Sequence, residues 1–266
     1  MATTAELPAK RETTNRRPLK RPTDRFGGSI PMALGAIAVT LLGFWRTFFS
    51  QLGKVDAAHR LHGALATGWL VLVLVQASLI GSRRYKWHRI LGWTSVPVFA
   101  LLVATSCYML VLMFSATGGM PIPFETAKIF GYSDVTALPL LIIVYASAII
   151  LRRDRHIHSR LISITLLAGL LPALARAFFG ILVVMGIAGT SSIEEVTKGL
   201  ILAMHPTYIS VLLVLAIAIF VDWKKARLRW PFPFAFAWVA INYATFFLGM
   251  SSRWFDRLAR AIASMA

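Results

Sequence analysis

The sequence predicts an all-α fold, a polytopic membrane helix bundle with about seven transmembrane helices. Hydrophobic residues fill 57% of the 266 positions and charged residues only 15%, whereas an average soluble domain carries about 25% charged residues. A soluble domain of this length could not bury so much apolar surface, so the bilayer has to be part of its solvent. The single cysteine, Cys107, excludes an internal disulfide and a cysteine-rich metal site. Soluble enzymes, disulfide scaffolds and zinc fingers are therefore excluded.

Residues 1–28 differ in composition from the rest of the chain. Lysines and arginines stand here among threonine, proline and asparagine, with few apolar side chains between them. Such a segment cannot bury enough apolar surface to offset the entropy lost on ordering. We therefore expect a disordered basic cytoplasmic tail.

Apolar runs of about 20 residues, long enough to cross roughly 30 Å of hydrocarbon, predict a transmembrane domain over residues 29–250. The predicted spans are 30–49, 61–82, 90–115, 133–151, 160–188, 200–221 and 231–250. The fifth span is long and contains Pro172, so we expect it to tilt or kink. Residues 251–266 are expected to form an amphipathic interfacial helix on the outer face.

The positive charge of the chain predicts its orientation. Lys and Arg number 28 against 11 Asp and Glu, which gives a net charge of +17. Apart from the N-terminal tail, most cations fall in three loops. They are Arg83, Arg84, Lys86 and Arg89; Arg152, Arg153, Arg155 and Arg160; and Lys224, Lys225, Arg227 and Arg229. The positive-inside rule places these loops and the N-terminus in the cytoplasm and the C-terminus outside. The charge thus reflects topology, and we expect the lipid bilayer, rather than nucleic acid, as the partner.

One face of the predicted second span carries polar and aromatic side chains. His62, Trp69 and Gln76 are spaced seven residues apart, so each lies only about 20° round the helix from the one before. Polar side chains within a span usually face other helices rather than lipid. The stripe is therefore expected to point into the bundle, where His62 either hydrogen-bonds a neighbouring helix or binds a ligand or cofactor.

Arg176 is a cation inside the predicted fifth span, 18 residues and so about five turns beyond His158. An arginine at the centre of a span costs about 2.5–3.5 kcal/mol on insertion scales, so it needs an anion. Asp134, in the outer part of the fourth span, is the candidate partner for a structural ion pair. The alternative is an acidic group on a ligand, such as the propionates of a haem.

Histidines on different spans form two pairs at matched depth. His62 and His205 lie near the outer side, and His88 lies near the inner side with His158 or His156. Paired histidines on facing helices are what bis-imidazole ligation of haem b requires. In this hypothesis His62, His205, His88 and His158 ligate haem iron, or another metal, and the two layers carry an electron across the membrane.

Several segments resemble a known group of proteins. They are residues 43–49, 59–69, 88–93, 158–161 and 171–176, with the pattern His-x6-Trp-x6-Gln followed by His-Arg-x-Leu-Gly. These segments resemble bacterial multi-pass membrane proteins classed as a domain of unknown function, over about residues 40–180. That resemblance implies a multi-pass protein of the bacterial cell inner membrane and no particular reaction. The layout of paired histidines is also similar to transmembrane b-type cytochromes that carry two haems and are reduced by ascorbate.

Three classes of function stay open at this point. The first is a haem- or metal-binding redox protein with a redox partner, in which Gly63, Gly92 and Gly169 leave room beside a flat macrocycle. The second is a carrier or sensor without a cofactor, with Asn242 and Tyr243 among the residues lining its cavity. The third is a structural or assembly subunit among other membrane subunits, in which the histidines only pack. The chain contains no Gly-x-Ser-x-Gly and no His-Glu-x-x-His motif, so hydrolytic chemistry is not expected.

Overall fold

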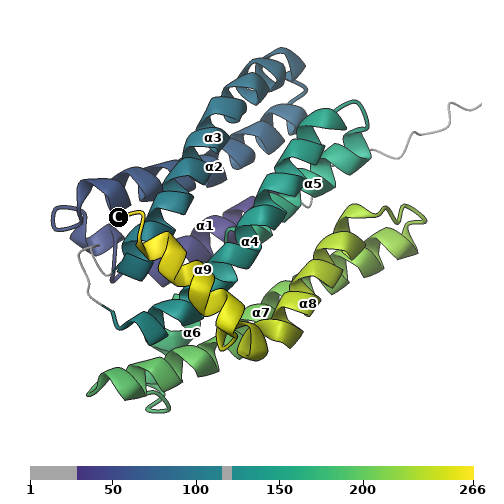
Figure 1. Cartoon of the computed structure of the whole chain (residues 1–266). Coiled ribbons are helices and arrows are strands. Elements are labelled where there is room, and N and C mark those ends of the chain that lie inside the picture. The colour runs from purple at the N-terminus through teal and green to yellow at the C-terminus, as the bar shows by residue number, and fades with distance from the viewer. Residues whose placement is uncertain (1–28, 116–121) are drawn as a thin grey trace, which may run out of the picture.

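A computed structural model describes residues 29–115 and 122–266, and the expected tail over residues 1–28 lies outside the described residues. The described chain is helical and contains no strand, so the predicted all-α class is confirmed. The helices are α1 (Ser29–Phe44), the 3₁₀ turn η1 (Phe49–Gln51), α2 (Ala57–Gly81), α3 (Tyr85–Ser115), α4 (Phe124–Ile150), α5 (Arg155–Ala168), α6 (Leu171–Val184), α7 (Ile193–Lys224), α8 (Pro231–Met250) and α9 (Arg253–Ala263) (Figure 1).

The helices have the length and composition of a membrane protein. Within the described residues, five helices (α2, α3, α4, α7 and α8) are long and apolar enough to cross a bilayer, and α5 with α6 makes a sixth if the bent pair is one span. The remaining apolar helix, α1, has only 16 residues, or about 24 Å of helix. The protein is therefore a helical membrane bundle, and the seventh crossing, through α1, stays a prediction.

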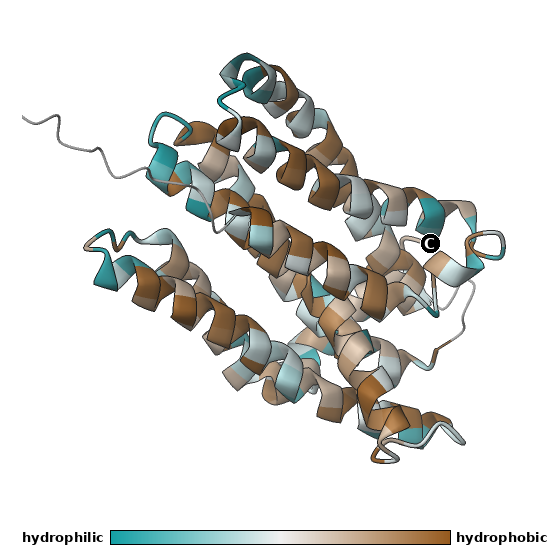
Figure 2. Ribbon diagram, turned by 180° about the vertical axis from the view of Figure 1, so that it is seen from behind, coloured by the Kyte–Doolittle hydropathy of each residue, from teal (hydrophilic) through white to brown (hydrophobic). Residues whose placement is uncertain are grey.

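Helix α4 is the centre of the bundle. It packs against α3, α5, α8 and α9 and touches α6 and α7, while α1 packs between α2 and α6. Figure 1 shows the α2–α3 pair on one side of α4 and the α7–α8 pair on the other. The hydropathy colouring in Figure 2 is brown along the helices and teal mainly at their ends, as expected for helices that cross hydrocarbon.

Polar side chains fix where several helices begin. Asp56 caps α2, Asp154 caps α5, Ser192 caps α7 and Ser252 caps α9, each accepting a hydrogen bond from a backbone N–H in the first turn. Such a cap satisfies an N–H that the helix itself leaves without a partner. Each cap therefore helps to fix the residue at which its helix begins.

The predicted fifth span is two helices rather than one. Helices α5 and α6 meet at a bend of 42°, with Gly169 as the C-cap residue of α5 and Pro172 in the first turn of α6. Proline has no N–H to donate to the carbonyl of Ala168, so the helix cannot continue unchanged through this point. The expected kink is therefore present, and it lies just before the proline.

Tight backbone contact holds α1 against α6. At Gly43 of α1, an added Cβ would overlap the backbone carbonyl of Ala173 in α6. Small residues allow such close approach between membrane helices, where association depends on packing rather than on the hydrophobic effect. Helix α1 is thus part of the bundle despite its short length.

A buried ion pair links the start of α5 to the end of α7. The Nε and Nη2 atoms of Arg160 donate to the two carboxylate oxygens of Asp222, at 2.5 and 2.7 Å. Both side chains are nearly buried, with relative exposures of 10% and 12%. Arg160 also donates to the carbonyls of His156 and Arg227. Arg160, expected among the loop cations, is in fact a structural link between two spans and the following turn.

Helix α9 closes the outer end of the bundle. Phe255 and Ala259 are fully buried, and the Phe255 ring packs against Phe114 of α3 and Tyr132 of α4. Lys128 of α4 joins α9 by an ion pair with Asp256 at 3.4 Å. The amphipathic helix expected over residues 251–266 thus buries its apolar face against protein, and Figure 1 shows it lying across α4.

Removing one partner of the Arg160–Asp222 pair should strongly destabilise the protein. Asp222→Asn leaves a buried guanidinium without its counter-ion, which costs about 3–5 kcal/mol in comparable buried pairs. Equilibrium unfolding in detergent measures the change. The matched control is Glu194→Gln, which breaks the exposed pair with Lys198 and should change the free energy of unfolding far less. Equal losses in the two variants would contradict a structural role for the buried pair.

The attachment of α9 should weaken in acid. A hydrogen bond from Arg260, helped by Lys128, holds the pKa of Asp256 below its usual range. This carboxylate therefore stabilises the fold above its unfolded pKa of about 3.9, and the contribution disappears as the pH falls through the lower folded pKa.

The melting temperatures of the native protein and Asp256→Asn, followed from pH 7 to pH 3, test this dependence. The native protein should melt higher at pH 7, and the difference should shrink below about pH 4. A difference that stays constant over this range would show that the carboxylate charge is not what holds α9.

Candidate functional site

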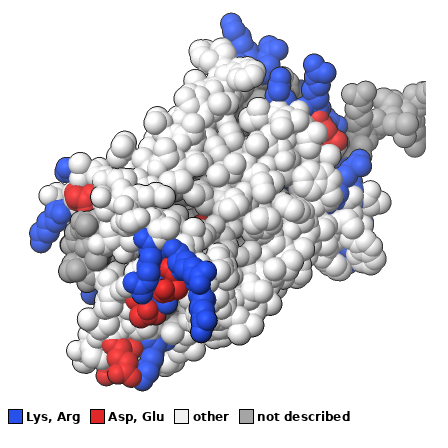
Figure 3. All heavy atoms as spheres, in the orientation of Figure 1, with Lys and Arg blue, Asp and Glu red and all other residues white. Residues whose placement is uncertain are grey.

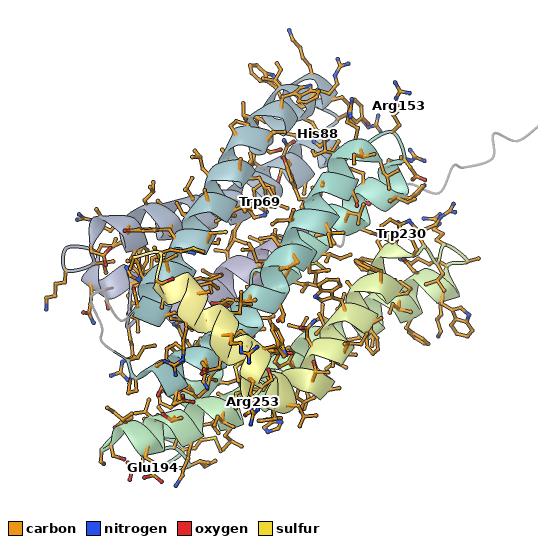
Figure 4. The ribbon with its side chains drawn as sticks, viewed as in Figure 1. Trp69, His88, Arg153, Glu194, Trp230 and Arg253 are labelled. Atoms are coloured by element: carbon orange, nitrogen blue, oxygen red, sulfur yellow. The ribbon has the colours of Figure 1, made fainter. Side chains whose placement is uncertain are left out.

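The polar stripe of α2 points into the bundle. Trp69 is 3% exposed and its Nε1–H donates to Oγ1 of Thr165 on α5 at 3.3 Å. The Trp69 ring also contacts Phe99 of α3 and Tyr145 of α4, with ring centroids 5.1 and 5.2 Å away. Trp69 therefore joins four helices near the middle of the bundle, between α2 and α4 in Figure 4.

His62, at the outer end of the stripe, binds the neighbouring helix. Its Nδ1 lies 3.2 Å from Oγ1 of Thr105 on α3, and that hydroxyl donates its one proton to the carbonyl of Leu102. Thr105 therefore accepts from His62, which places the imidazole proton on Nδ1. Gly63, next to His62, is covered by the ring of Phe48, so it leaves no room for a macrocycle.

His205, the other outer histidine, has a separate environment on α7. Its Nδ1 lies 2.8 Å from the hydroxyl of Tyr243 on α8, and its ring packs on Phe247 at 5.2 Å. Helix α2 packs on α1 and α3, whereas α7 packs on α6 and α8. The structure does not bring His62 and His205 together as a pair.

The two inner histidines do lie together. The ring centroids of His88 on α3 and His158 on α5 are 6.4 Å apart and their planes are nearly perpendicular, at 85°. His158 Nδ1 lies 2.8 Å from the backbone carbonyl of Ala148 on α4. A carbonyl only accepts, so His158 carries its proton on Nδ1 and presents the lone pair of Nε2. Side chains of α3 and α5 thus meet at this site, and α4 fixes one of them.

Gln76, the inner end of the α2 stripe, completes this site. Gln76 Oε1 and His88 Nδ1 are both buried atoms that have no hydrogen-bond partner among the described residues. The His88 imidazole lies beside the backbone of Gln76. The amide nitrogen of Gln76 faces Gly92, where an added Cβ would lie 3.8 Å away. Since Gly92 follows His88 by one helical turn, Gln76 runs along the histidine-bearing face of α3.

Arg176 is placed in the outer half of the bundle, away from the inner histidines. Its guanidinium lies over the rings of Phe44 and Phe130, at 4.7 and 5.1 Å, and it donates to the carbonyl of Pro172 at 3.0 Å. Asp134 interacts with it electrostatically. The partner suggested by the sequence is therefore close enough to act on Arg176, and aromatic faces supply the rest of its environment.

The inner end of the molecule is strongly cationic. Figure 3 shows Lys and Arg gathered at the α2–α3 and α4–α5 turns, a band without charged side chains, and a mixed patch of both signs near α9. Figure 4 places His88 and Arg153 at the same end, opposite Glu194 and Arg253. In the orientation predicted from the loop cations, this cationic end of the molecule would face the cytoplasm.

Comparisons of this chain with protein-family models, with curated proteins and with solved structures find no match. The resemblance noted in the sequence therefore stays a prediction. The site is defined by its own geometry, and its most distinctive feature is the pair of inner histidines with Gln76.

Proposed function

We propose that this integral membrane protein binds one haem b near its cytoplasmic end, with His88 and His158 as axial ligands, and exchanges electrons with a redox partner at the bacterial inner membrane. The observation that carries the proposal is the 6.4 Å separation of the two imidazole rings. Imidazole nitrogens bind a metal at about 2.0–2.1 Å, so two imidazoles that lie this close together could hold one haem iron between them.

The orientation of His158 supports a ligand role. A metal-binding histidine almost always donates its second ring N–H to a carbonyl, a carboxylate or water, which fixes the tautomer and strengthens the ligand. The hydrogen bond from His158 Nδ1 to the Ala148 carbonyl has this form. It leaves Nε2 as the donor atom for iron.

The number of donors favours haem over a bare metal ion. Within the described residues, no group of three or more His, Cys, Asp or Glu side chains could hold a metal ion. A structural zinc site uses four protein ligands and a catalytic one three, whereas haem iron takes its other four ligands from the porphyrin and needs only two axial residues. Two imidazoles are therefore sufficient for haem and too few for a typical metal centre.

The proposal contains one haem rather than the two layers suggested by the sequence. His62 and His205 each bind a side chain of an adjacent helix, and Arg176 interacts with aromatic rings and with Asp134. These contacts support structural roles for the outer residues. When bound, haem supplies one-electron exchange, while the protein holds it, orients His158 and restricts the access of water.

Difference absorption spectra test the proposal. Protein purified from haem-supplied cells, reduced with dithionite, should show a sharp α-band, and His88→Ala and His158→Ala should each abolish it because each removes an axial ligand. His62→Ala and His205→Ala are matched controls that should keep it. A colourless native protein, or loss of the band in the outer variants alone, would contradict the proposal.

Gln76 should tune the site. If Nε2 of His88 bound the iron, its proton would lie on Nδ1, a buried atom that, like Oε1 of Gln76, has no hydrogen-bond partner among the described residues. Losing such an outer contact typically weakens metal binding about 10–100-fold. We expect Gln76→Leu to retain haem less tightly and Gln76→Glu to retain it with a lower reduction potential, because a carboxylate makes the imidazole more electron-rich.

Haem titration and redox potentiometry measure these two effects. Thr165→Val, which removes the hydroxyl that binds Trp69 on the same stripe, is the control and should change neither quantity. Unchanged affinity and potential in both Gln76 variants would show that Gln76 does not contact the haem ligand.

A second candidate function, a carrier for a small ligand, is favoured by a different observation. The α5–α6 bend lies beside Tyr208, whose buried hydroxyl has no hydrogen-bond partner among the described residues. Asn242 lines the same small cavity, and broken helices near polar side chains mark binding sites in many transporters. Stabilisation of colourless protein by a small ligand, lost in Tyr208→Phe, would favour this function over haem binding.

A further inference from the structure

Two cytoplasmic turns of the chain form one positively charged surface. The α2–α3 and α4–α5 turns are joined by the contact of the His88 and His158 rings and by Arg152, whose guanidinium lies 5.4 Å from the ring centroid of Trp93 on α3. We call this surface the inner cationic patch. It consists of Arg83, Arg84, Lys86, Arg89, Arg152, Arg153 and Arg155, all exposed.

The patch has almost no negative charge of its own. Asp154 is the one acidic residue within segments 82–93 and 151–158. Its carboxylate caps α5 by accepting hydrogen bonds from the backbone N–H groups of His156 and Ile157, at 2.9 and 3.1 Å. The guanidinium groups of the patch are thus left to attract an external anion.

The backbone conformation of Arg83 also supports an anion-binding role for this patch. Arg83 follows the end of α2 with a φ of +60°, in the left-handed region where glycine is the usual residue and other residues are strained. Ala226, in the α7–α8 turn, has a φ of +50° but carries no charge. An arginine held where glycine would be more stable suggests that its side chain has a use.

The surroundings of the patch identify the anion as a lipid. Three exposed aromatic side chains, Tyr85, Trp87 and Trp93, lie in the first turns of α3, at the level where such residues meet phospholipid headgroups. Deeper along the same helices, exposed apolar side chains such as Leu101 of α3 and Ile142 of α4 face outward. A ligand here needs an anionic head and a hydrocarbon tail.

We infer that the inner cationic patch binds an anionic phospholipid of the cytoplasmic leaflet, with its phosphate between the α2–α3 and α4–α5 turns and its acyl chains along α3 and α4. Arginine suits this role because its planar group donates two hydrogen bonds to one phosphate. The site does not depend on haem, since none of its cations is an iron ligand.

Native mass spectrometry of the detergent-purified protein, with phosphatidylglycerol or phosphatidylcholine added, tests the inference. Phosphatidylglycerol should be retained in preference. In the double variant Arg152→Gln/Arg153→Gln, retention of phosphatidylglycerol should fall about tenfold or more. Lys224→Gln/Lys225→Gln removes the same charge from the α7–α8 turn and should lower retention less than twofold.

Substitutions at the two strained turns separate lipid binding from folding. Arg83→Gly and Ala226→Gly should both raise the melting temperature because each relieves a left-handed backbone. Only Arg83→Gly should also reduce retention of phosphatidylglycerol. The two glycine substitutions should have the same effects on lipid retention in a His88→Ala protein, because the inference does not require haem.

Several results would overturn the inference. Equal retention of the two lipids, or equal losses from the α4–α5 and α7–α8 double variants, would show only unspecific attraction. An equal effect of Arg83→Gly and Ala226→Gly on retention would remove the role of the Arg83 side chain. Stabilisation by inorganic phosphate alone, or capture of an acidic protein in place of lipid, would identify a different occupant.

Discussion

A polar group left in hydrocarbon without a partner costs several kcal/mol, and this constraint fixes how the helices of the bundle are rotated. The indole of Trp69 reaches Thr165, the hydroxyl of Tyr145 reaches Ser95, and the imidazole of His158 reaches the carbonyl of Ala148. Each bond joins a different pair of helices among α2 to α5. Because each helix has to direct its polar face inward, the four helices fit together in one register, and that register brings His88 next to His158.

The two ends of the molecule differ in how their polar groups are used. At the outer end, α9 buries Phe255, and His62 binds Thr105 of an adjacent helix. At the inner end, His88 and Gln76 each have a buried atom that finds no hydrogen-bond partner in the part of the chain that the structure describes, and the cations of the adjoining turns are exposed. Unsatisfied buried groups are uncommon in stable folds and need an explanation. A bound cofactor near the cytoplasmic surface would provide one.

The sequence predicted the class of fold, because the length of the apolar runs depends on local composition. It did not predict which helices are neighbours. His62 and His205 were expected to form a pair at matched depth, but α1 and α6 pack between the helices that carry them. Depth follows from counting residues, whereas lateral order depends on packing contacts such as Gly43 against Ala173, which one sequence does not reveal.

The ion-pair partners of charged residues at the span ends were also not predicted from the sequence. Arg160 was expected among the loop cations, yet it is buried in an ion pair. Lys128 is also buried in an ion pair. Asp222, an acidic residue at the end of an apolar run, was the signal that Arg160 has a partner. For Lys128 the partner Asp256 is 128 residues away in sequence, so only the packing of α9 on α4 reveals the pair.

The most direct test of the central claim is an experimental structure of the protein purified from haem-supplied cells. The account predicts density for a porphyrin between α3 and α5, with its iron on the line joining His88 to His158 and with Gln76 turned toward His88. Stoichiometric haem bound elsewhere in the protein would contradict it. So would a structure without haem, from a sample purified in the same way.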